Sequence, residues 1–418
     1  MYQSDDHILY IGTSAGEWVG ISGRDRLEHV FVVGATGSGK TTTMLPAFIQ
    51  DAQQGRAGVF FDVFGRHSEL LLDYIPRGRE VIYLNAADFE YPFAWNELHN
   101  VPSEYRHVVM DSIVSALRQQ WRDGWGDRME YIITNSLLTL LPHGTATLLD
   151  LNRVISDEKW CMHLVQTKVK NDKVRDFWLT EFPWGNRSVD VRYRREWLMP
   201  VQNKIGRLAV VDPLANLLGQ VKNKINLRQI MDEQKLLIVN LDKGKFGERN
   251  ADLLGSLLLS SLYHASFQRT NTYPFYCYID EFTSFATESF EGMLSEARNF
   301  GLHLHLSGQY LKQIDDRISP AVRDAILGNC GTLVVFKVAA SDVETLAPQF
   351  THPFNPIDLR NLERHQAFIR YRNDAEMQIR SVPLEDWGFE KYNEGEYHIA
   401  QSRERYATPR GEVEAARH

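Results

Sequence analysis

Short apolar runs alternate with helical stretches along the first hundred residues. Three runs rich in β-branched and aromatic residues predict buried strands, and helical periodicity follows the first two. These runs are His29–Val33, Gly58–Val63 and Glu80–Leu84. Such strand–helix–strand alternation is typical of an α/β fold with a mainly parallel, doubly wound sheet. Before it, residues 1–28 alternate apolar and polar positions between Gly and Ser, which predicts a small hairpin.

The pattern changes near Asn96 and then returns. From about Pro102 to Leu227 the periodicity is helical, with Asp127–Leu141 as its clearest amphipathic helix. Strand-like runs resume after it, at Lys235–Leu241, Tyr273–Ile279, Leu302–Gln309 and Gly331–Phe336. The pattern therefore predicts a nucleotide-binding-type domain in two parts, 1–100 and 229–394, an inserted all-α domain at 101–228 and a loose polar tail at 395–418.

Composition places the chain among ordinary globular proteins. Hydrophobic residues make up 43% and charged residues 24% of its 418 residues. The three cysteines suit a reduced, cytoplasmic interior, because they are widely spaced and form no disulfide or zinc pattern. The longest apolar stretch, Leu253–Phe267, is shorter than the roughly 18 residues of a membrane span. We expect a soluble, cytoplasmic protein without an integral membrane segment.

Charge is unevenly distributed. The chain carries a net −8, yet residues 161–228 hold 13 Lys and Arg against 6 Asp and Glu. That local +7 leaves −15 for the remainder, so a polyanion would contact one region only. A solvated surface without a partner is an equally good interpretation of the same charges.

The most specific motif lies directly after the first strand. Residues 34–41 read GATGSGKT, which matches the phosphate-binding pattern G-x-x-x-x-G-K-[ST]. Its glycines let backbone N–H groups surround phosphates, Lys40 supplies a positive charge, and the Thr41 hydroxyl can bind Mg²⁺. The helix that follows tolerates Pro46 only if that residue lies near the first turn. The residues predicted to bind nucleotide are Gly34, Thr36, Gly37, Ser38, Gly39, Lys40, Thr41 and Thr42.

Paired carboxylates end a later strand. Asp280 and Glu281 follow the apolar run Phe275–Ile279. In a phosphate-loop NTPase, the first acid would hold Mg²⁺ together with Thr41, and the second would polarise the attacking water. Because strand alternation aims neighbouring side chains apart, Glu281 must lie beyond the strand, where the backbone turns.

Two further polar residues are candidates for catalysis. Gln309 ends the next predicted strand, so a parallel sheet would bring its amide to the same edge, near the γ-phosphate and the attacking water. Arg298 precedes that strand; it is either a surface cation or a finger inserted into a neighbouring subunit's site. His67, His303 and His305 lack supporting ligands, and we interpret them as packing or edge residues.

Several stretches together resemble the FtsK–HerA branch of phosphate-loop ATPases, most closely the TraG/TraD-type coupling proteins of type IV secretion and conjugation. The matching stretches are HVFVVGATGSGKTT at 29–42, GVFFDVFGR at 58–66, VIYLNAADFEYPFAWNEL at 81–98, KLLIVNLDKGKFGERNADLLGSLL at 235–258, YIDEFTSF at 278–285, EARNFGLHLHLSGQ at 296–309 and ILGNCGTLVVFKVAASD at 326–342. They follow the family's order along nearly the whole chain.

The resemblance implies a RecA-like motor with an all-α domain inserted between its two Walker motifs. It also implies ATP and Mg²⁺ as cofactors, a hexameric ring that translocates DNA, and a finger arginine at Arg298. Relaxase or type IV secretion components would then be partners. Two features depart from the family: no transmembrane anchor is found, and Asp62-Val63-Phe64-Gly65-Arg66 replaces the usual Asp-Pro-Lys/His-Gly turn.

Two other functions remain open at this stage. One is a HerA-like motor for DNA processing or anti-phage defence that works with a partner nuclease. The other, of a different class, is a ring-shaped scaffold that uses ATP only to assemble and recruits protein partners. DNA-stimulated ATP hydrolysis would separate a motor from a scaffold.

Overall fold

The computed structural model describes residues 7–417, apart from 185–190, 352–357 and 373–374 and the side chains of 191–195. Contacts divide the chain into two compact units. The first comprises Met1–Leu84, Leu227–Ser256 and Ala265–Ser402, and the second comprises Asn85–Asn226, Leu257–His264 and Arg403–His418. This division differs from the predicted domain boundaries in placing part of a long helix and the C-terminal residues with the inserted segment.

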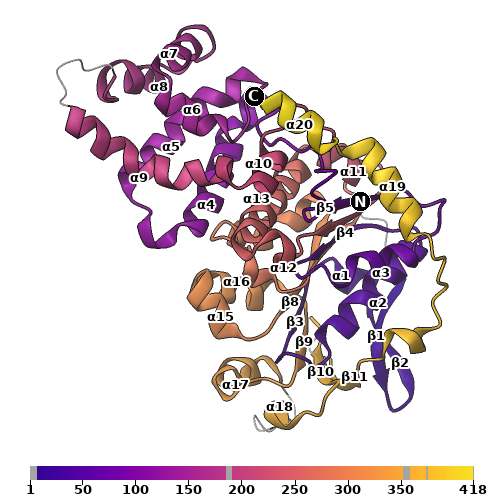
Figure 1. Ribbon diagram of the computed structural model, residues 1–418. Helices are drawn as coiled ribbons and strands as arrows, with labels where there is room; N and C mark the ends of the chain where they lie inside the picture. The colour runs from indigo at the N-terminus through magenta and orange to yellow at the C-terminus, as the bar shows by residue number, and fades with distance from the viewer. Residues whose placement is uncertain (1–6, 185–190, 352–357, 373–374, 418) are drawn as a thin grey trace. The chain divides into compact units, whose positions relative to one another are not determined.

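An eleven-stranded sheet runs through the first unit in the order β2-β1-β11-β10-β9-β3-β8-β7-β4-β6-β5 (Figure 1). The strands are β1 (Ile8–Ser14), β2 (Glu17–Ser22), β3 (Val30–Val33), β4 (Ala57–Asp62), β5 (Val81–Asn85), β6 (Leu236–Asn240), β7 (Phe275–Ile279), β8 (Leu302–Gly308), β9 (Thr332–Phe336), β10 (Gln366–Arg370) and β11 (Glu376–Arg380).

The sheet has a parallel centre and an antiparallel side. Strands β9, β3, β8, β7, β4 and β6 pair in parallel, which confirms the predicted doubly wound α/β sheet. From β9 outward, β10, β11, β1 and β2 pair antiparallel. The structure therefore confirms the predicted N-terminal hairpin, formed by β1 and β2. This hairpin lies at the outer end of the antiparallel side.

Helices cover both faces of the parallel centre. The helices of the first unit include α1 (Gly23–Arg26), α2 (Lys40–Gln53), α3 (Ser68–Asp73), α11 (Leu227–Asp232), α12 (Lys243–Phe246), α14 (Phe290–Glu296), α15 (Leu311–Arg317), α16 (Pro320–Asn329), α17 (Ala340–Leu346), α18 (Asp358–Asn361) and α19 (Gly395–Tyr406). In Figure 1, α2 and α3 lie on one side of the strands, and α15 and α16 lie on the other. Alternate strand residues serve the two faces: Val30 and Val32 join the α2 core, whereas Phe31 packs edge-on against Phe282.

The second unit is mainly helical in its described residues. Its helices are α4 (Arg106–Gln120), α5 (Asp127–Leu140), α6 (Asp150–Ser156), α7 (Glu158–Thr167), α8 (Asp172–Asp176), α9 (Val191–Val210), α10 (Asp212–Leu218) and α20 (Arg410–Arg417), and α13 (Glu248–Phe267) contributes residues to both units. Buried aromatic rings form part of its core, where the Trp178 indole N–H donates to Thr139 Oγ1 at 2.8 Å. An indole buried with its donor satisfied stabilises such a core.

Two sequence-based expectations are wrong. Pro46 lies in the interior of α2, seven residues from its start, and not in the first turn. It deprives the Thr42 carbonyl of its usual donor, but most of α2 is buried and packing maintains the helix. Residues 395–417 form α19 and α20 in place of a loose tail. Their arginines have acidic partners, including Arg403 with Asp88 at 2.6 Å, so the polar composition did not mean disorder.

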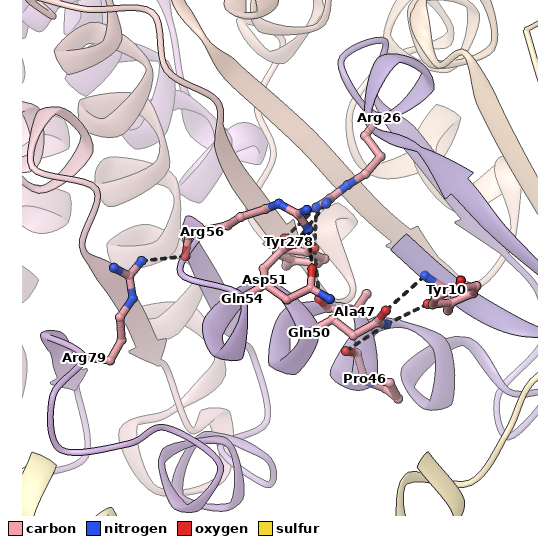
Figure 2. A network of polar contacts seen from close by, with 10 residues as sticks. All are labelled: Tyr10, Arg26, Pro46, Ala47, Gln50, Asp51, Gln54, Arg56, Arg79 and Tyr278. Carbon is pink, nitrogen blue, oxygen red and sulfur yellow. Dashed lines mark hydrogen bonds and ion pairs between the residues drawn. The ribbon is translucent and has the colours of Figure 1, made fainter. Parts of the chain in front are cut away.

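A buried polar network lies beneath the α2 face of the sheet (Figure 2). The fully buried Arg26 guanidinium binds both carboxylate oxygens of Asp51 on α2, at 2.9 and 2.5 Å. The Tyr278 hydroxyl on β7 donates to the same carboxylate at 2.6 Å, and Arg56 reaches it at 3.2 Å. Burial lowers the pKa of Arg26, but Asp51, Tyr278 and Tyr276 together outweigh burial and raise it. The network joins α1 to α2, which begins at Lys40, and to β7, which is followed by Asp280 and Glu281.

Candidate nucleotide site

The phosphate loop joins β3 to α2 in a conformation that requires glycine. Gly37 has φ of 75° and Gly39 φ of 128°, a region that side chains with a Cβ rarely adopt. The Lys40 ammonium folds back over the loop and donates to the carbonyls of Gly34 at 2.7 Å and Ala35 at 3.2 Å. The predicted loop therefore has the compact shape that its spacing implies.

The loop residues fit a phosphate group. The Ser38 hydroxyl is buried and has no hydrogen-bond partner among the described residues. The first turn of α2, which begins at Lys40, supplies N–H groups that have no carbonyl partner within the helix. Backbone donors at the positive end of a helix dipole bind anions, and phosphate oxygens would satisfy both sets of donors.

Asp280 lies one residue beyond β7, with both carboxylate oxygens engaged. The Thr41 hydroxyl donates to Oδ2 at 3.2 Å, and the Ser307 hydroxyl on β8 donates to Oδ1 at 2.5 Å. A hydroxyl and a carboxylate this close offer the oxygen ligands that Mg²⁺ prefers. These two residues would hold the cation, and Ser307, to which sequence reasoning gave no role, would orient the carboxylate.

Glu281 lies beyond the end of β7, where the backbone turns, as predicted. Its backbone is left-handed, with φ of 56°, so the chain bends immediately after the strand. The Glu281 N–H donates to Ser307 Oγ at 3.3 Å, and the Gln309 amide hydrogen-bonds its carboxylate. Burial, followed by the charge of Asp280, raises the pKa of Glu281, while Lys40, Gln309 and Lys243 oppose the shift. A buried carboxylate with a raised pKa suits a base that must accept a proton near neutrality.

Lys40 completes the charge balance of the site. Burial lowers the pKa of its ammonium, and the carboxylates of Glu281 and Asp280 counteract that effect. Lys243, at the start of α12, pairs with Asp252 at 2.7 Å and supplies a second nearby cation. The structure thus brings together Lys40, Thr41, Asp280, Glu281 and Gln309 from three separate stretches of sequence.

Arg298 is not part of this cluster. It lies in the 3₁₀ turn Ala297–Phe300, before β8 begins, and pairs with Glu28, which comes just before β3. The phosphate loop follows the carboxyl end of β3, and Gln309 follows the carboxyl end of β8. Because β8 has seven residues, the two ends lie roughly 20 Å apart. Arg298 therefore does not reach the site of its own chain in this arrangement, and a role in a neighbour's site stays a prediction.

Asp62 organises the turn that departs from the family pattern. Its carboxylate accepts the N–H groups of Phe64, Gly65, His67 and Ser68 at 2.8–3.2 Å, and also the Ser68 hydroxyl. These bonds fix the connection between β4 and α3 without the rigid Pro of the usual turn. Asp62 therefore holds the backbone of this turn in place, a role that the sequence alone did not indicate.

The histidines have packing roles, as predicted for His303 and His305. Both rings are buried on β8, where the His305 ring packs at a tilt against Tyr278, with the ring centroids 4.5 Å apart, and His303 Nδ1 contacts the Leu27 carbonyl at 3.1 Å. Burial lowers the pKa of His303 to about 3, so it stays neutral. His67 lies at the edge of the Asp62 turn.

Comparisons with known proteins agree with this geometry. Residues 17–175 match a family model described as the type IV secretion-system coupling protein DNA-binding domain. Residues 274–347 match a second model, the TraM recognition site of TraD and TraG. Both models describe domains of TraG/TraD-type coupling proteins, so these two segments of the chain are similar to that family. A search of curated protein sequences found no match.

Solved structures share the fold of this chain. Plasmid coupling protein TrwB in complex with ADP and Mg²⁺ has a TM-score of 0.64 at 16% identity, with 92% of this chain and 91% of that one covered. TrwB with a non-hydrolysable ATP analogue scores 0.62 at 18% identity, covering 89% of each chain. VirB4 of Thermoanaerobacter pseudethanolicus scores 0.56 at 12% identity, covering 91% of this chain and 97% of that one. The fold is that of a RecA-like phosphate-loop NTPase. No helix in the described part of this chain is long and apolar enough to span a bilayer.

Proposed function

We propose that this chain is an ATP-driven DNA motor of the coupling-protein type, which hydrolyses ATP between neighbouring subunits of a ring. The convergence of Lys40, Thr41, Asp280 and Glu281 on one sheet edge is the observation that carries the proposal. The structures of TrwB with ADP and Mg²⁺ and with an ATP analogue support the choice of cofactors. The match of residues 17–175 to a coupling-protein DNA-binding domain supports DNA as the cargo.

Each site residue has a separate task in this account. Thr41 and Asp280 hold the cation, which neutralises phosphate charge when it is bound with nucleotide. Glu281 accepts a proton from the attacking water, and its hydrogen bond from Gln309 keeps the carboxylate directed. Because Gln309 hydrogen-bonds that carboxylate, its amide would register whether the γ-phosphate is present. Lys40 would exchange its contacts with the loop carbonyls for phosphate oxygens.

Arg298 would complete the site of the next subunit. Its position at the opposite ends of the strands suits a finger that serves a neighbour in a hexameric ring. Arginine supplied in this way neutralises charge that develops in the transition state. This role of Arg298 depends on the assembly of subunits into a ring. Rings that mix two different variants therefore provide its test.

Exposed cations in the second unit support contact with a polyanion. Lys168, Lys170, Lys173 and Arg175 are all exposed around α7 and α8. They belong to the stretch with the local excess of +7; its arginine side chains at 187, 192, 194 and 195 lie outside the described residues. Lysine and arginine contacts to phosphates release counterions, so DNA binding should weaken steeply as salt rises.

Protein partners follow from the second family model. Residues 274–347 match a TraM recognition site, which supports a protein of the DNA-processing complex as a partner, with relaxase or secretion components beside it.

The test is phosphate release from Mg²⁺–ATP, measured alone and with single- or double-stranded DNA, with Lys40→Ala as the inactive control. We expect either form of DNA to raise the wild-type rate severalfold at low salt, and high salt to abolish that increase. A rate that neither form changes at low salt would contradict the motor and favour the scaffold.

A further inference from the structure

The back of the phosphate loop is held by a part of the sheet that the nucleotide-binding motif does not include. His365 precedes β10 and Ser381 follows β11, both on the antiparallel side. The His365 N–H donates to the Ser38 carbonyl at 2.7 Å, and the Ser381 N–H donates to the His365 carbonyl at 2.8 Å. One backbone bond thus joins the hairpin to the loop, and a second holds His365 against the residue that follows β11.

Side chains reinforce the same contact. The His365 ring Nδ1 lies 3.1 Å from the Ser381 hydroxyl. This contact fixes the orientation of the ring at the end of the β10–β11 strand pair. His365 has φ of 70°, a left-handed conformation that is costly for a residue with a Cβ. Ser381 is buried, and its hydroxyl would lie 2.8 Å from a Cβ placed on Gly39. The hairpin therefore packs directly against the loop's last glycine.

The bond to Ser38 has a geometric consequence. The peptide that joins Ser38 and Gly39 is planar and trans, so its carbonyl and its N–H point in opposite directions. Because His365 holds the carbonyl on the hairpin side, the Gly39 N–H must point to the other side, where the Lys40 loop would receive a phosphate. Preorganised backbone donors of this kind contribute most when they need not reorient on binding.

We propose that His365, secured by Ser381, is a positioning residue that aims the Gly39 N–H at the phosphates of a bound nucleoside diphosphate or triphosphate. This inference deepens the proposed function and rests on the nucleotide site described there. It adds His365 and Ser381, at the end of the β10–β11 hairpin, to that site, although neither residue belongs to the motif.

The experiment measures the affinity of the full chain for fluorescent ADP and ATP with Mg²⁺ and without DNA. We expect Ser381→Ala and His365→Ala to weaken binding by about three- to tenfold, since each loses part of one hydrogen-bonded arrangement. His365→Asn should bind nearly as the wild type, because Asn tolerates a positive φ and retains an acceptor for the Ser381 hydroxyl. The effect should appear in KM for ATP, with kcat at saturation nearly unchanged.

Two controls separate the possible failures. Ile369→Val, in the buried part of β10, should lower Tm while leaving nucleotide affinity unchanged, since it destabilises the hairpin away from the loop. Lys40→Ala must abolish binding; if it binds like the wild type, the nucleotide site itself is wrong and this inference falls with it. If Lys40→Ala loses binding while folded Ser381→Ala and His365→Ala both bind like the wild type, the positioning role alone is overturned. The positioning role would also be overturned if Ile369→Val weakened nucleotide binding as much as Ser381→Ala does.

Discussion

At their carboxyl ends, β3 and β8 lead to Lys40 and Gln309 in one site, whereas at their amino ends the same strands are preceded by Glu28 and Arg298. The first edge gathers buried groups, two of which have pKa values shifted by burial. The second presents an arginine whose side chain is 37% exposed. One chain therefore holds two unlike half-sites, one at each edge of the sheet. Substitutions can perturb either half-site or the buried structure between them.

The largest effect is expected at the carboxyl edge. Glu281→Gln removes the base but retains a side chain of the same shape, so kcat should fall about 1,000-fold. ATP affinity should change little, because Lys40 and Thr41 hold the nucleotide. Single-turnover hydrolysis and nucleotide titration measure the two separately, and turnover close to that of the wild type would remove Glu281 from the mechanism.

The network between the edges should matter for stability. Arg26→Met leaves the buried Asp51 carboxylate without its bidentate partner, which should lower the free energy of unfolding by about 3–5 kcal/mol. Nucleotide affinity should persist at temperatures where the variant is folded, because no network residue lies in the site.

The matched control for that variant is Arg77→Met, which breaks the exposed ion pair between Arg77 and Glu394. Its Tm should not change measurably, since exposed ion pairs contribute little. Equal destabilisation by the two variants in thermal or urea unfolding would show that the buried network has no special role.

A smaller effect is expected from the residue that sequence reasoning missed. Ser307→Ala frees one oxygen of Asp280 and removes an acceptor from the Glu281 N–H. We expect the Mg²⁺ concentration for half-maximal ATPase activity to rise about tenfold, as loss of a group that orients a ligand does elsewhere. An unchanged Mg²⁺ titration would mean that Thr41 alone suffices to orient Asp280.

Much of the parallel centre could be predicted from the sequence because buried parallel strands are continuous apolar runs, as in Phe275–Ile279. The hairpin strands Gln366–Arg370 and Glu376–Arg380 were missed, since polar residues interrupt both and no tight-turn signal joins them. The partners of a site residue depend on strand order, which spacing does not encode. For this reason Asp280 was predicted, whereas its contact with Ser307 on the neighbouring strand was not.

The C-terminal residues illustrate the same limit. An arginine-rich stretch has the same composition whether it is solvated or paired, and only the fold brings Asp88 to Arg403. Pro46 was misplaced for a related reason, because local propensity excludes it from a helix interior whereas burial of α2 on most sides permits it.

Subunit mixing tests the central claim, that the two edges belong to one composite site. Arg298→Ala and Glu281→Gln should each reduce kcat about 1,000-fold in uniform rings. When the two variants are co-assembled in equal amounts, about a quarter of the interfaces pair an intact Glu281 with an intact Arg298. We predict recovery of DNA-stimulated ATPase activity far above that of either variant alone. Mixed assemblies no more active than the parent variants would contradict the account.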